Sequence, residues 1–196
     1  MAYDYALIAP NGEVLRTERR THQLEGLSEH AHKARWLPLV ERRAAFDPIS
    51  QVCEDAGYVV EKSRVVRTYN VRPKNASEIA AMREAKIAEI KAEFRSRSAA
   101  PITYAVARKD YLWHADADAV GSILAALLVI SGGSRTWTPK DALSPVKVTL
   151  AELSGLGAAI ASRNDVLFAA KKAKEAAVAA LTDPASIAAF PVKEGW

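Results

Sequence analysis

The 196-residue sequence is poor in cysteine and in aromatic residues. Its one cysteine, Cys53, excludes an intramolecular disulfide and a cysteine-rich zinc site, and it fits synthesis in a reducing cytosol. Aromatic residues make up 7% of the chain, and alanine inflates the 49% hydrophobic content. We therefore expect a thin, helix-dominated interior that oligomerisation would stabilise.

Long apolar runs are also lacking. The most apolar run, residues 119–130, spans 12 residues, whereas a helix needs about 20 to cross a bilayer. The N-terminus, from Met1 to Tyr5, has neither the basic lead nor the apolar core of a signal peptide. The sequence therefore predicts a soluble protein with no membrane anchor.

Charge of one sign is not concentrated anywhere in the chain. Basic residues exceed acidic ones by 27 to 23, with an excess of two in residues 1–75, one in 76–100 and one in 101–196. A nucleic-acid-binding protein typically has a sustained basic stripe with interleaved aromatic residues, because contacts with phosphates dominate its affinity for nucleic acid. We therefore expect no nucleic-acid partner, although the sequence pI is about 9.2.

Residues 1–73 have the pattern of a small β-rich docking domain. Asn11-Gly12, between the runs 3–9 and 13–16, is the strongest short signal for a hairpin. A two-stranded hairpin is not stable alone, so partner strands are expected at 36–40, 57–60 and 65–71. Pro38 would confine its strand to an edge of the sheet. A small sheet with open edges is either incomplete or a docking surface.

Residues 74–98 are predicted to form a connecting helix. Asn75 and Glu78 fit a capped start, and Pro101 excludes the helical conformation from the residue before it. The apolar stripe of this helix is Ala76, Ala80, Ile87, Ile90 and Phe94. Ile79 and Met82 lie off the stripe. The helix therefore either packs between more than one neighbour, as in a short trimeric coiled coil, or packs on its own chain.

Residues 99–196 are predicted to form an α+β domain with a small antiparallel sheet, so that the whole chain falls in the α+β class. Strands are expected at 102–107 and 111–114, a buried helix at 119–130, a hairpin with a tight turn between Trp137 and Val148, and a short helix at 184–190. Between the hairpin and the last helix lies a long alanine-rich helix.

The long helix has a marked start and one apolar stripe. Thr149 and Glu152 have the spacing of a capping box. The stripe, over about 32 residues or roughly 50 Å, consists of Leu153, Leu156, Ile160, Leu167, Ala170, Ala177 and Leu181. Gly155 and Gly157 each cost about 1 kcal/mol against alanine. They therefore indicate a neighbour that approaches closely, or a bend.

One cluster has residue types that could carry chemistry. His114, Asp116 and Asp118 would share one face of a strand and could hold a divalent metal. A second ligand cluster is missing, however, and aspartates just before an apolar run are typical of a helix N-terminus. We interpret them as capping residues and predict no catalytic residue, no metal site and no cofactor.

Other candidate residues have structural interpretations. His22, His30 and His32 lack the spacing of a zinc-binding helix and are interpreted as surface residues. Lys171-Lys172-Ala173-Lys174 is interpreted as a solvated helix face. The four tryptophans are interpreted as core anchors, with Trp196 also able to insert into a partner.

Several motifs carry a resemblance through their order and spacing. They are Trp137-x-x-x-Asp141, Val146-Lys147-Val148-Thr149, the long alanine-rich helix and Gly195-Trp196. Together they resemble the C-terminal domain of unknown function of phage and prophage tail-region proteins, which are associated with tail fibres or baseplates. More loosely, Trp36–Glu41, Phe46-Asp47-Pro48 and residues 65–73 resemble the leading region of the same proteins.

The resemblance implies a structural role at the tail tip or tail fibre and supplies no catalytic residue. We therefore expect a non-enzymatic adaptor or accessory subunit that is made in the host cytoplasm and located in the virion tail. It would form a homo-oligomer, with a trimer as one option, and bind other phage tail or fibre proteins. One alternative is a tail-fibre assembly chaperone that is not retained in the virion. A metal-dependent enzyme built on His114, Asp116 and Asp118 is a second alternative.

Overall fold

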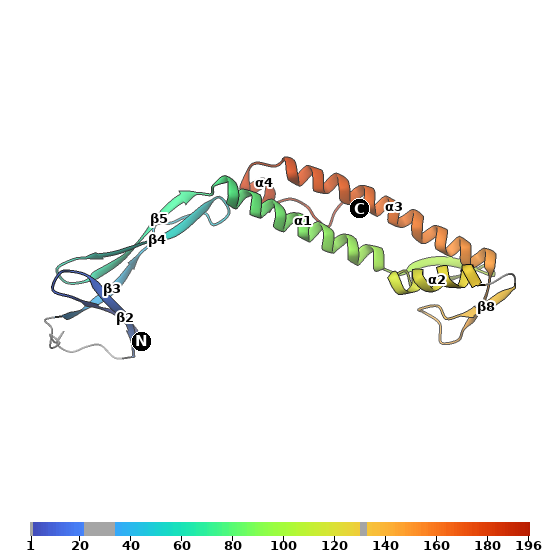
Figure 1. The fold of residues 1–196 in the computed structure, drawn as a ribbon, viewed down its shortest axis with the longest axis horizontal. Coiled ribbons are helices and arrows are strands. Elements are labelled where there is room, and N and C mark those ends of the chain that lie inside the picture. Colours follow the sequence, from blue (N-terminus) through green and yellow to red (C-terminus); the bar gives the residue numbers. More distant parts are fainter. Residues whose placement is uncertain (1, 22–33, 130–132) are drawn as a thin grey trace. The chain divides into compact units, whose positions relative to one another are not determined.

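The computed structural model describes residues 2–21, 34–129 and 133–196, which belong to two compact units. Unit 1 comprises Met1–Ala76 and unit 2 comprises Ser77–Trp196. Strands make up the regular structure described in unit 1, and helices with two small hairpins make up that of unit 2 (Figure 1). The predicted α+β class is confirmed.

Unit 1 is a five-stranded sheet with the strand order β2-β1-β3-β5-β4. The strands are β1 (Tyr3–Ile8), β2 (Val14–Arg20), β3 (Arg35–Arg42), β4 (Gln51–Val60) and β5 (Val65–Pro73). All neighbouring strands are antiparallel except β3 and β5, which are parallel. The predicted hairpin at Asn11-Gly12 is confirmed, because β1 pairs with β2 and Gly12 has the positive φ of 86° that the turn requires.

The prediction that Pro38 confines its strand to an edge is wrong, because β3 lies in the middle of the sheet. The strand changes neighbours at this residue. Residues up to Pro38 pair with β1, and residues from Leu39 onward pair with β5. Pro38 therefore has a paired strand on one side only, which is the local environment that tolerates a residue without an N–H group.

The core of unit 1 is small. Four buried residues, Ala6, Ile8, Leu37 and Val65, form its centre on one face of the sheet. On the other face, the ring of Trp36 lies 5.1 Å from the guanidinium groups of both Arg16 and Arg20. Trp36 is buried, so it is a core anchor as predicted.

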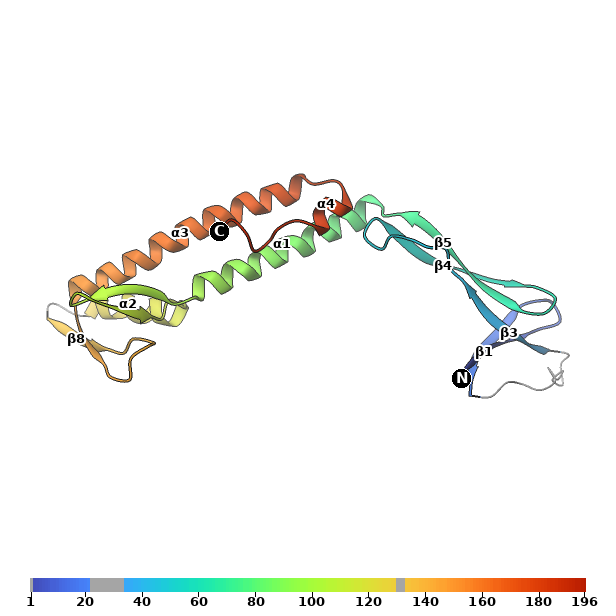
Figure 2. The same ribbon diagram turned by 180° about the vertical axis from the view of Figure 1, so that it is seen from behind.

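Unit 2 contains the remaining elements. They are α1 (Ala76–Ala99), β6 (Ile102–Val106), β7 (Lys109–Trp113), α2 (Ala117–Val129), β8 (Ser134–Trp137), β9 (Val146–Thr149), α3 (Leu150–Ala180) and α4 (Pro184–Ala188). The helix that the sequence set apart as a connector, α1, groups with this unit. Both views show α1 lying beside α3 (Figures 1 and 2).

Strands β6 and β7 form the predicted hairpin with a turn of two residues. The turn residues are Ala107 and Arg108, with φ values of 51° and 64°, so β7 begins at Lys109 rather than at the predicted position 111. Two successive positive φ values match the right-handed twist of the flanking strands. The N–H of Ala107 donates to the Glu152 carboxylate over 2.8 Å, which ties the turn to the start of α3.

The hairpin of β8 and β9 is confirmed, but its predicted tight turn is wrong. The strands are joined by eight residues, 138–145, because this loop lies beside β7. The N–H of Lys140 donates to the carbonyl of Leu112 over 2.7 Å, and the Asp141 carboxylate accepts from the N–H of Leu112 over 3.1 Å. The loop thus satisfies the N–H and the carbonyl of Leu112 in β7.

The main core of unit 2 lies between α2, α3 and the two hairpins. Its buried residues include Trp113, Ile123, Val148, Leu153 and Leu156. The predicted stripe on α3 is correct from Leu153 to Leu167, but Val178 is buried near its end where Ala177 was expected. Val178 follows Ile160 by 18 residues, about five turns, and therefore returns to the same side of the helix.

The predicted capping box at the start of α3 is confirmed. The Thr149 side chain accepts from the N–H of Glu152 over 3.2 Å, and the Glu152 carboxylate accepts from the N–H of Thr149 over 2.9 Å. Hydrogen bonds from Thr149 and from the N–H of Ala107 hold the pKa of Glu152 below its ordinary value. One carboxylate therefore joins the helix start to the β6–β7 turn.

We expect Thr149→Ala to lower the free energy of unfolding of unit 2 by about 1 kcal/mol, because the substitution removes the side-chain acceptor of the cap. Urea denaturation followed by helical circular dichroism measures this change. Thr182→Ala is the matched control, because Thr182 is exposed and follows the end of α3. Equal stability of the two variants would mean that the cap contributes nothing.

Candidate interaction surfaces

Helices α1 and α3 contact each other along a seam. Ile90 of α1 is fully buried, and the rings of Phe94 and Phe168 meet edge to face with centroids 6.3 Å apart. The ammonium group of Lys171 lies 5.2 Å from the Phe94 ring and 5.3 Å from the Phe168 ring. The predicted stripe of α1 thus packs on its own chain at Ile90 and Phe94, which is one of the two alternatives left open.

Hydrogen bonds from Arg163 link the middle of α3 to the end of α1. Its guanidinium group donates to the carbonyls of Ser98 and Ala100, each over 2.6 Å, and to that of Pro101 over 3.4 Å. These carbonyls lie where α1 ends and has no intrahelical donors left. Burial lowers the pKa of the Arg163 side chain.

The C-terminal segment covers one side of the seam (Figure 2). Lys174 donates to the carbonyl of Pro191 over 3.1 Å, and Arg97 donates to that of Lys193 over 2.9 Å. The two cations also lie 5.5 and 5.6 Å from the ring of Trp196. Trp196 is therefore half-buried against its own chain.

The other side of the seam is open and hollowed. Two hollows, of about 640 and 580 Å³, are lined by residues of α1 and α3, and the second is also lined by residues of α2. We call them the seam groove. Its walls include Ile87, Lys91, Phe94, Arg95 and Ser98 of α1, Asn164, Lys171, Lys172, Glu175 and Ala179 of α3, and Val120 and Leu124 of α2.

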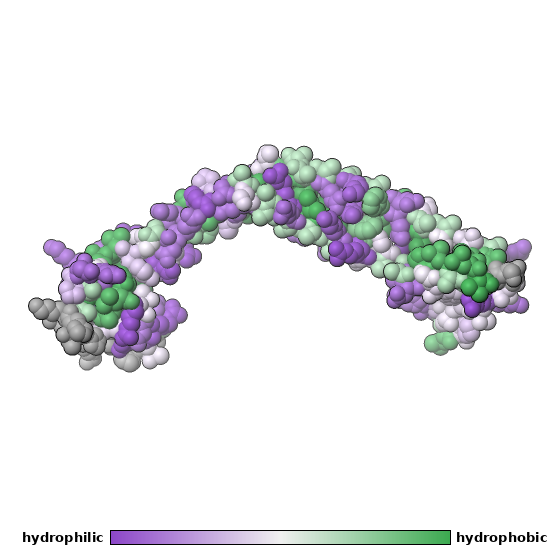
Figure 3. Space-filling view, viewed as in Figure 1, coloured by the Kyte–Doolittle hydropathy of each residue, from purple (hydrophilic) through white to green (hydrophobic). Residues whose placement is uncertain are grey.

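Helix α2 carries an exposed apolar face next to this groove. Leu124, Leu128 and Val129 are 56%, 87% and 78% exposed, whereas Ile123 and Ala126 on the opposite face are buried. Figure 3 shows hydrophobic residues gathered over α2. The prediction of a buried helix here is thus wrong for one of its faces. A contiguous exposed apolar face of this kind is typical of an interaction site.

The two edges of the unit 1 sheet carry features that oppose pairing with another strand. Edge strand β2 has four charged residues, Arg16, Glu18, Arg19 and Arg20. Edge strand β4 is interrupted by a bulge between Asp55 and Gly57. Natural sheets use charge and bulges to prevent edge-to-edge association, so the edges suit docking less well than the helical surfaces of unit 2 do.

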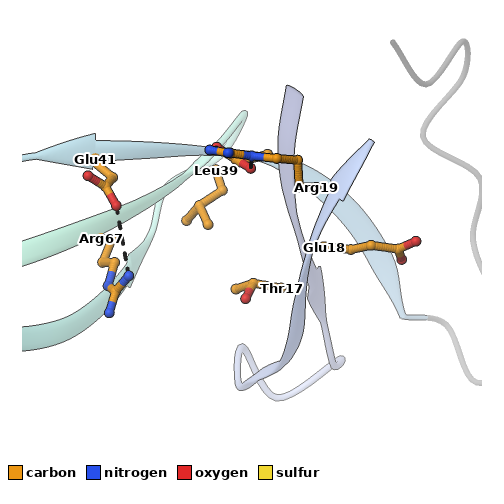
Figure 4. Close-up of a pocket in the computed structure, with 7 residues that line it drawn as sticks. Thr17, Glu18, Arg19, Leu39, Glu41 and Arg67 are labelled. Carbon is orange, nitrogen blue, oxygen red and sulfur yellow. Dashed lines mark hydrogen bonds and ion pairs between the residues drawn. The ribbon is translucent and has the colours of Figure 1, made fainter. Parts of the chain in front are cut away.

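A cleft of about 300 Å³ in unit 1 is lined by charged side chains (Figure 4). Arg19 donates to both carboxylate oxygens of Asp4, over 2.8 and 3.1 Å, and this bond lowers the pKa of Asp4. The guanidinium group of Arg67 lies 2.6 Å from the Asp55 carboxylate and 3.8 Å from that of Glu41. These carboxylates already face cations, which does not favour a role as a catalytic base.

The structure places Asp116 as the cap of α2, as interpreted from the sequence. Its carboxylate accepts from the N–H of Ala119 over 2.9 Å. Nδ1 of His114 lies 3.9 Å from this carboxylate, and Asp118 lies in the first turn of the helix. Within residues 2–21, 34–129 and 133–196, no three His, Cys, Asp or Glu side chains are grouped so that they could hold a metal ion. His22, His30 and His32 lie outside the described residues.

The interpretation of residues 171–174 as a solvated face is wrong for two of the three lysines. The ammonium group of Lys171 lies over the rings of Phe94 and Phe168, and that of Lys174 over the rings of Phe190 and Trp196. Lys172 is 60% exposed and fits the prediction, although its ammonium group lies 5.5 Å from the Phe168 ring. Cation–π contacts of this kind depend on where the aromatic rings lie in the fold, which a charge count does not reveal.

The sequence indicated neither the seam groove nor the exposure of Phe168. The α1 stripe included Ile87 and Phe94, but the partner of that stripe lies more than 60 residues further along the chain. Phe94 near the end of α1 and Phe168 near the middle of α3 were the available signal. Among the described residues, no helix is both long enough and apolar enough to span a membrane.

Comparison with known proteins gives one match. The model of a family described as a domain of unknown function (DUF4376) matches residues 81–190, which is more than half of the chain. The matched range begins in α1 and ends just after α4, so it contains both walls of the seam groove and the apolar face of α2. No curated protein and no solved structure matches the chain.

Proposed function

The chain belongs to the DUF4376 family, and we propose that it is a structural phage tail protein, because its C-terminal motifs resemble those of phage tail-region proteins and its exposed surfaces suit protein–protein interfaces. It acts as a non-enzymatic adaptor or accessory subunit at the tail tip or tail fibre, through protein–protein interfaces. Its partners are further copies of itself, with a trimer as one arrangement, and other tail or fibre proteins. Its place is the virion tail, and neither nucleic acid nor a membrane anchor has a role.

The observation that carries this proposal is the apolar face of α2. Leu124, Leu128 and Val129 expose most of their side chains on a helix whose other face is already packed on α3. Each Å² of apolar surface left in water costs about 25 cal/mol of free energy relative to burial. Contact with another subunit removes this cost. In the cleft of unit 1, the carboxylates already face cations, which does not favour the alternative of an enzyme active site there.

Self-association is tested with full-length protein by multi-angle light scattering. We expect the wild-type protein to exceed the monomer mass of 21.2 kDa and the double variant Leu128→Lys/Val129→Lys to return to it. Leu143→Lys is the matched control, because Leu143 is fully exposed in the loop between β8 and β9. A wild-type monomer, or equal masses for the two variants, would remove α2 as the contact between copies.

Location in the particle is tested by mass spectrometry of purified phage particles from the host that carries the gene. We expect the chain among the particle proteins. The alternative, a tail-fibre assembly chaperone, predicts the chain in infected cells and its loss from finished particles. Presence in the particle therefore supports the structural role, and absence overturns it.

A further inference from the structure

The seam groove has the length of a short helix. Its α1 wall is formed by Ile87, Lys91, Phe94 and Ser98, which share one flank of that helix at spacings of three and four residues. Along α3 the groove runs from Asn164 to Ala179. Fifteen residues of helix rise about 22 Å, so a helix of about four turns would fill the groove.

The floor of the groove is apolar. Phe94 lines it, and the neighbouring Phe168, whose ring meets that of Phe94, remains 49% exposed. Ile87 lines one end and Leu124 of α2 the other. An amphipathic helix binds such a groove through side chains at spacings of three and four residues.

The rim of the groove carries uncompensated positive charge. Lys91 and Arg95, one turn apart on α1, make no ion pair with any residue that the structure describes. Lys171 and Lys172 share one carboxylate, that of Glu175, at 3.7 and 3.4 Å. The second acid of the lining, Asp116, is engaged as the cap of α2. The groove therefore complements a negatively charged partner.

Polar atoms at one end of the groove also lack partners. The side-chain oxygens of Ser98 and Asn164 are buried, and neither has a hydrogen-bond partner among the described residues. A buried oxygen without a donor costs about 1–3 kcal/mol. Both oxygens are already shielded from solvent, so the apolar floor and the charged rim, not these atoms, carry the recognition of a partner.

From this geometry we propose that the seam groove binds an amphipathic helix of another tail protein, with an apolar stripe on the groove floor and acidic residues beside the stripe. The proposal rests on the structural role above and names the partner for this surface. A second copy of the chain fits less well, because two facing seam grooves would bring Lys91 and Arg95 against cations of the same kind. Leu128 and Val129 of α2, which are not among the residues that line the groove, remain free for contacts between copies.

The test uses full-length protein and two labelled synthetic peptides of about 16 residues. Both peptides carry leucines at helical spacing, with glutamates beside them in the first and lysines in the second. Fluorescence anisotropy is expected to show about tenfold tighter binding of the acidic peptide, equivalent to about 1.4 kcal/mol, and a smaller preference as salt is raised. Phe168→Ala is expected to weaken binding of the acidic peptide.

The decisive variant is Lys91→Glu/Arg95→Glu/Lys172→Glu, which is expected to reverse the preference. Lys62→Glu/Arg135→Glu/Lys147→Glu makes the same charge change at exposed sites outside the groove and is expected to retain it. Unchanged helical circular dichroism shows that both variants are folded. Equal binding of the two peptides, or loss of selectivity in both variants, would overturn the proposal.

Two further results separate this proposal from the structural role. If Phe168→Glu abolishes self-association in light scattering, a second copy occupies the groove and the proposal fails. If the chain is present in purified particles but binds both peptides equally, the structural role is supported and the proposed acidic helix is contradicted. If the chain prefers the acidic peptide but is missing from the particles, the structural role is contradicted.

Discussion

Arg163→Ala is expected to lower the free energy of unfolding of unit 2 by about 2–3 kcal/mol, the loss typical of hydrogen bonds that involve a charged group. The guanidinium group serves the carbonyls of Ser98, Ala100 and Pro101, which lie more than 60 residues away in the sequence. Without it, these three carbonyls would lose their side-chain donor, and the seam between α1 and α3 would loosen. Urea denaturation followed by helical circular dichroism measures the change.

Arg163→Lys separates charge from geometry. A lysine keeps the positive charge but cannot donate to three carbonyls from one planar group. We therefore expect Arg163→Lys to lower the free energy of unfolding by about half as much as Arg163→Ala does. Arg135→Ala is the control, because Arg135 is exposed on β8, and we expect it to change stability by less than about 0.5 kcal/mol. A loss for Arg163→Ala no larger than this control would show that the seam holds without the guanidinium bonds.

Local signals in the sequence predicted the elements whose cause is also local. Asn11-Gly12 accepts positive φ without help from the rest of the chain, and the capping box of Thr149 and Glu152 is complete within four residues. The predictions that failed depend on distant partners. Pro38 is tolerated inside a sheet because β3 exchanges β1 for β5 at that residue, and no local pattern contains this information.

The candidate surfaces could be predicted only in part, because they also depend on contacts between residues that are distant in the sequence. The apolar run of α2 is visible in the sequence, but its composition is apolar on every face, so periodicity could not tell which leucines the core would leave exposed. The seam groove needs the pairing of α1 with α3, which is set by Ile90, the Phe94–Phe168 contact and Arg163. None of these contacts has a signature at short sequence spacing.

The two glycines of α3 have different expected responses to the same substitution. A Cβ atom placed on Gly155 would lie 2.0 Å from the hydroxyl oxygen of Tyr104, whereas one placed on Gly157 would lie 3.4 Å from a methyl carbon of Ile123. Both alanines gain about 1 kcal/mol of helix propensity. Their difference therefore isolates the clash, and we expect Gly155→Ala to be less stable than Gly157→Ala by about 1–3 kcal/mol.

Tyr104→Phe identifies the clashing group. Removing the hydroxyl leaves the ring carbon that bore it 3.0 Å from the new Cβ, so the phenylalanine is expected to relieve much of the penalty of Gly155→Ala and none of the change in Gly157→Ala. A double-mutant cycle measured by urea denaturation gives the coupling free energy. A coupling near zero would mean that Tyr104 moves away without cost. In that case the glycine would not be needed for the approach of β6 to α3, and the bend that the sequence offered as an alternative would become the better account of Gly155.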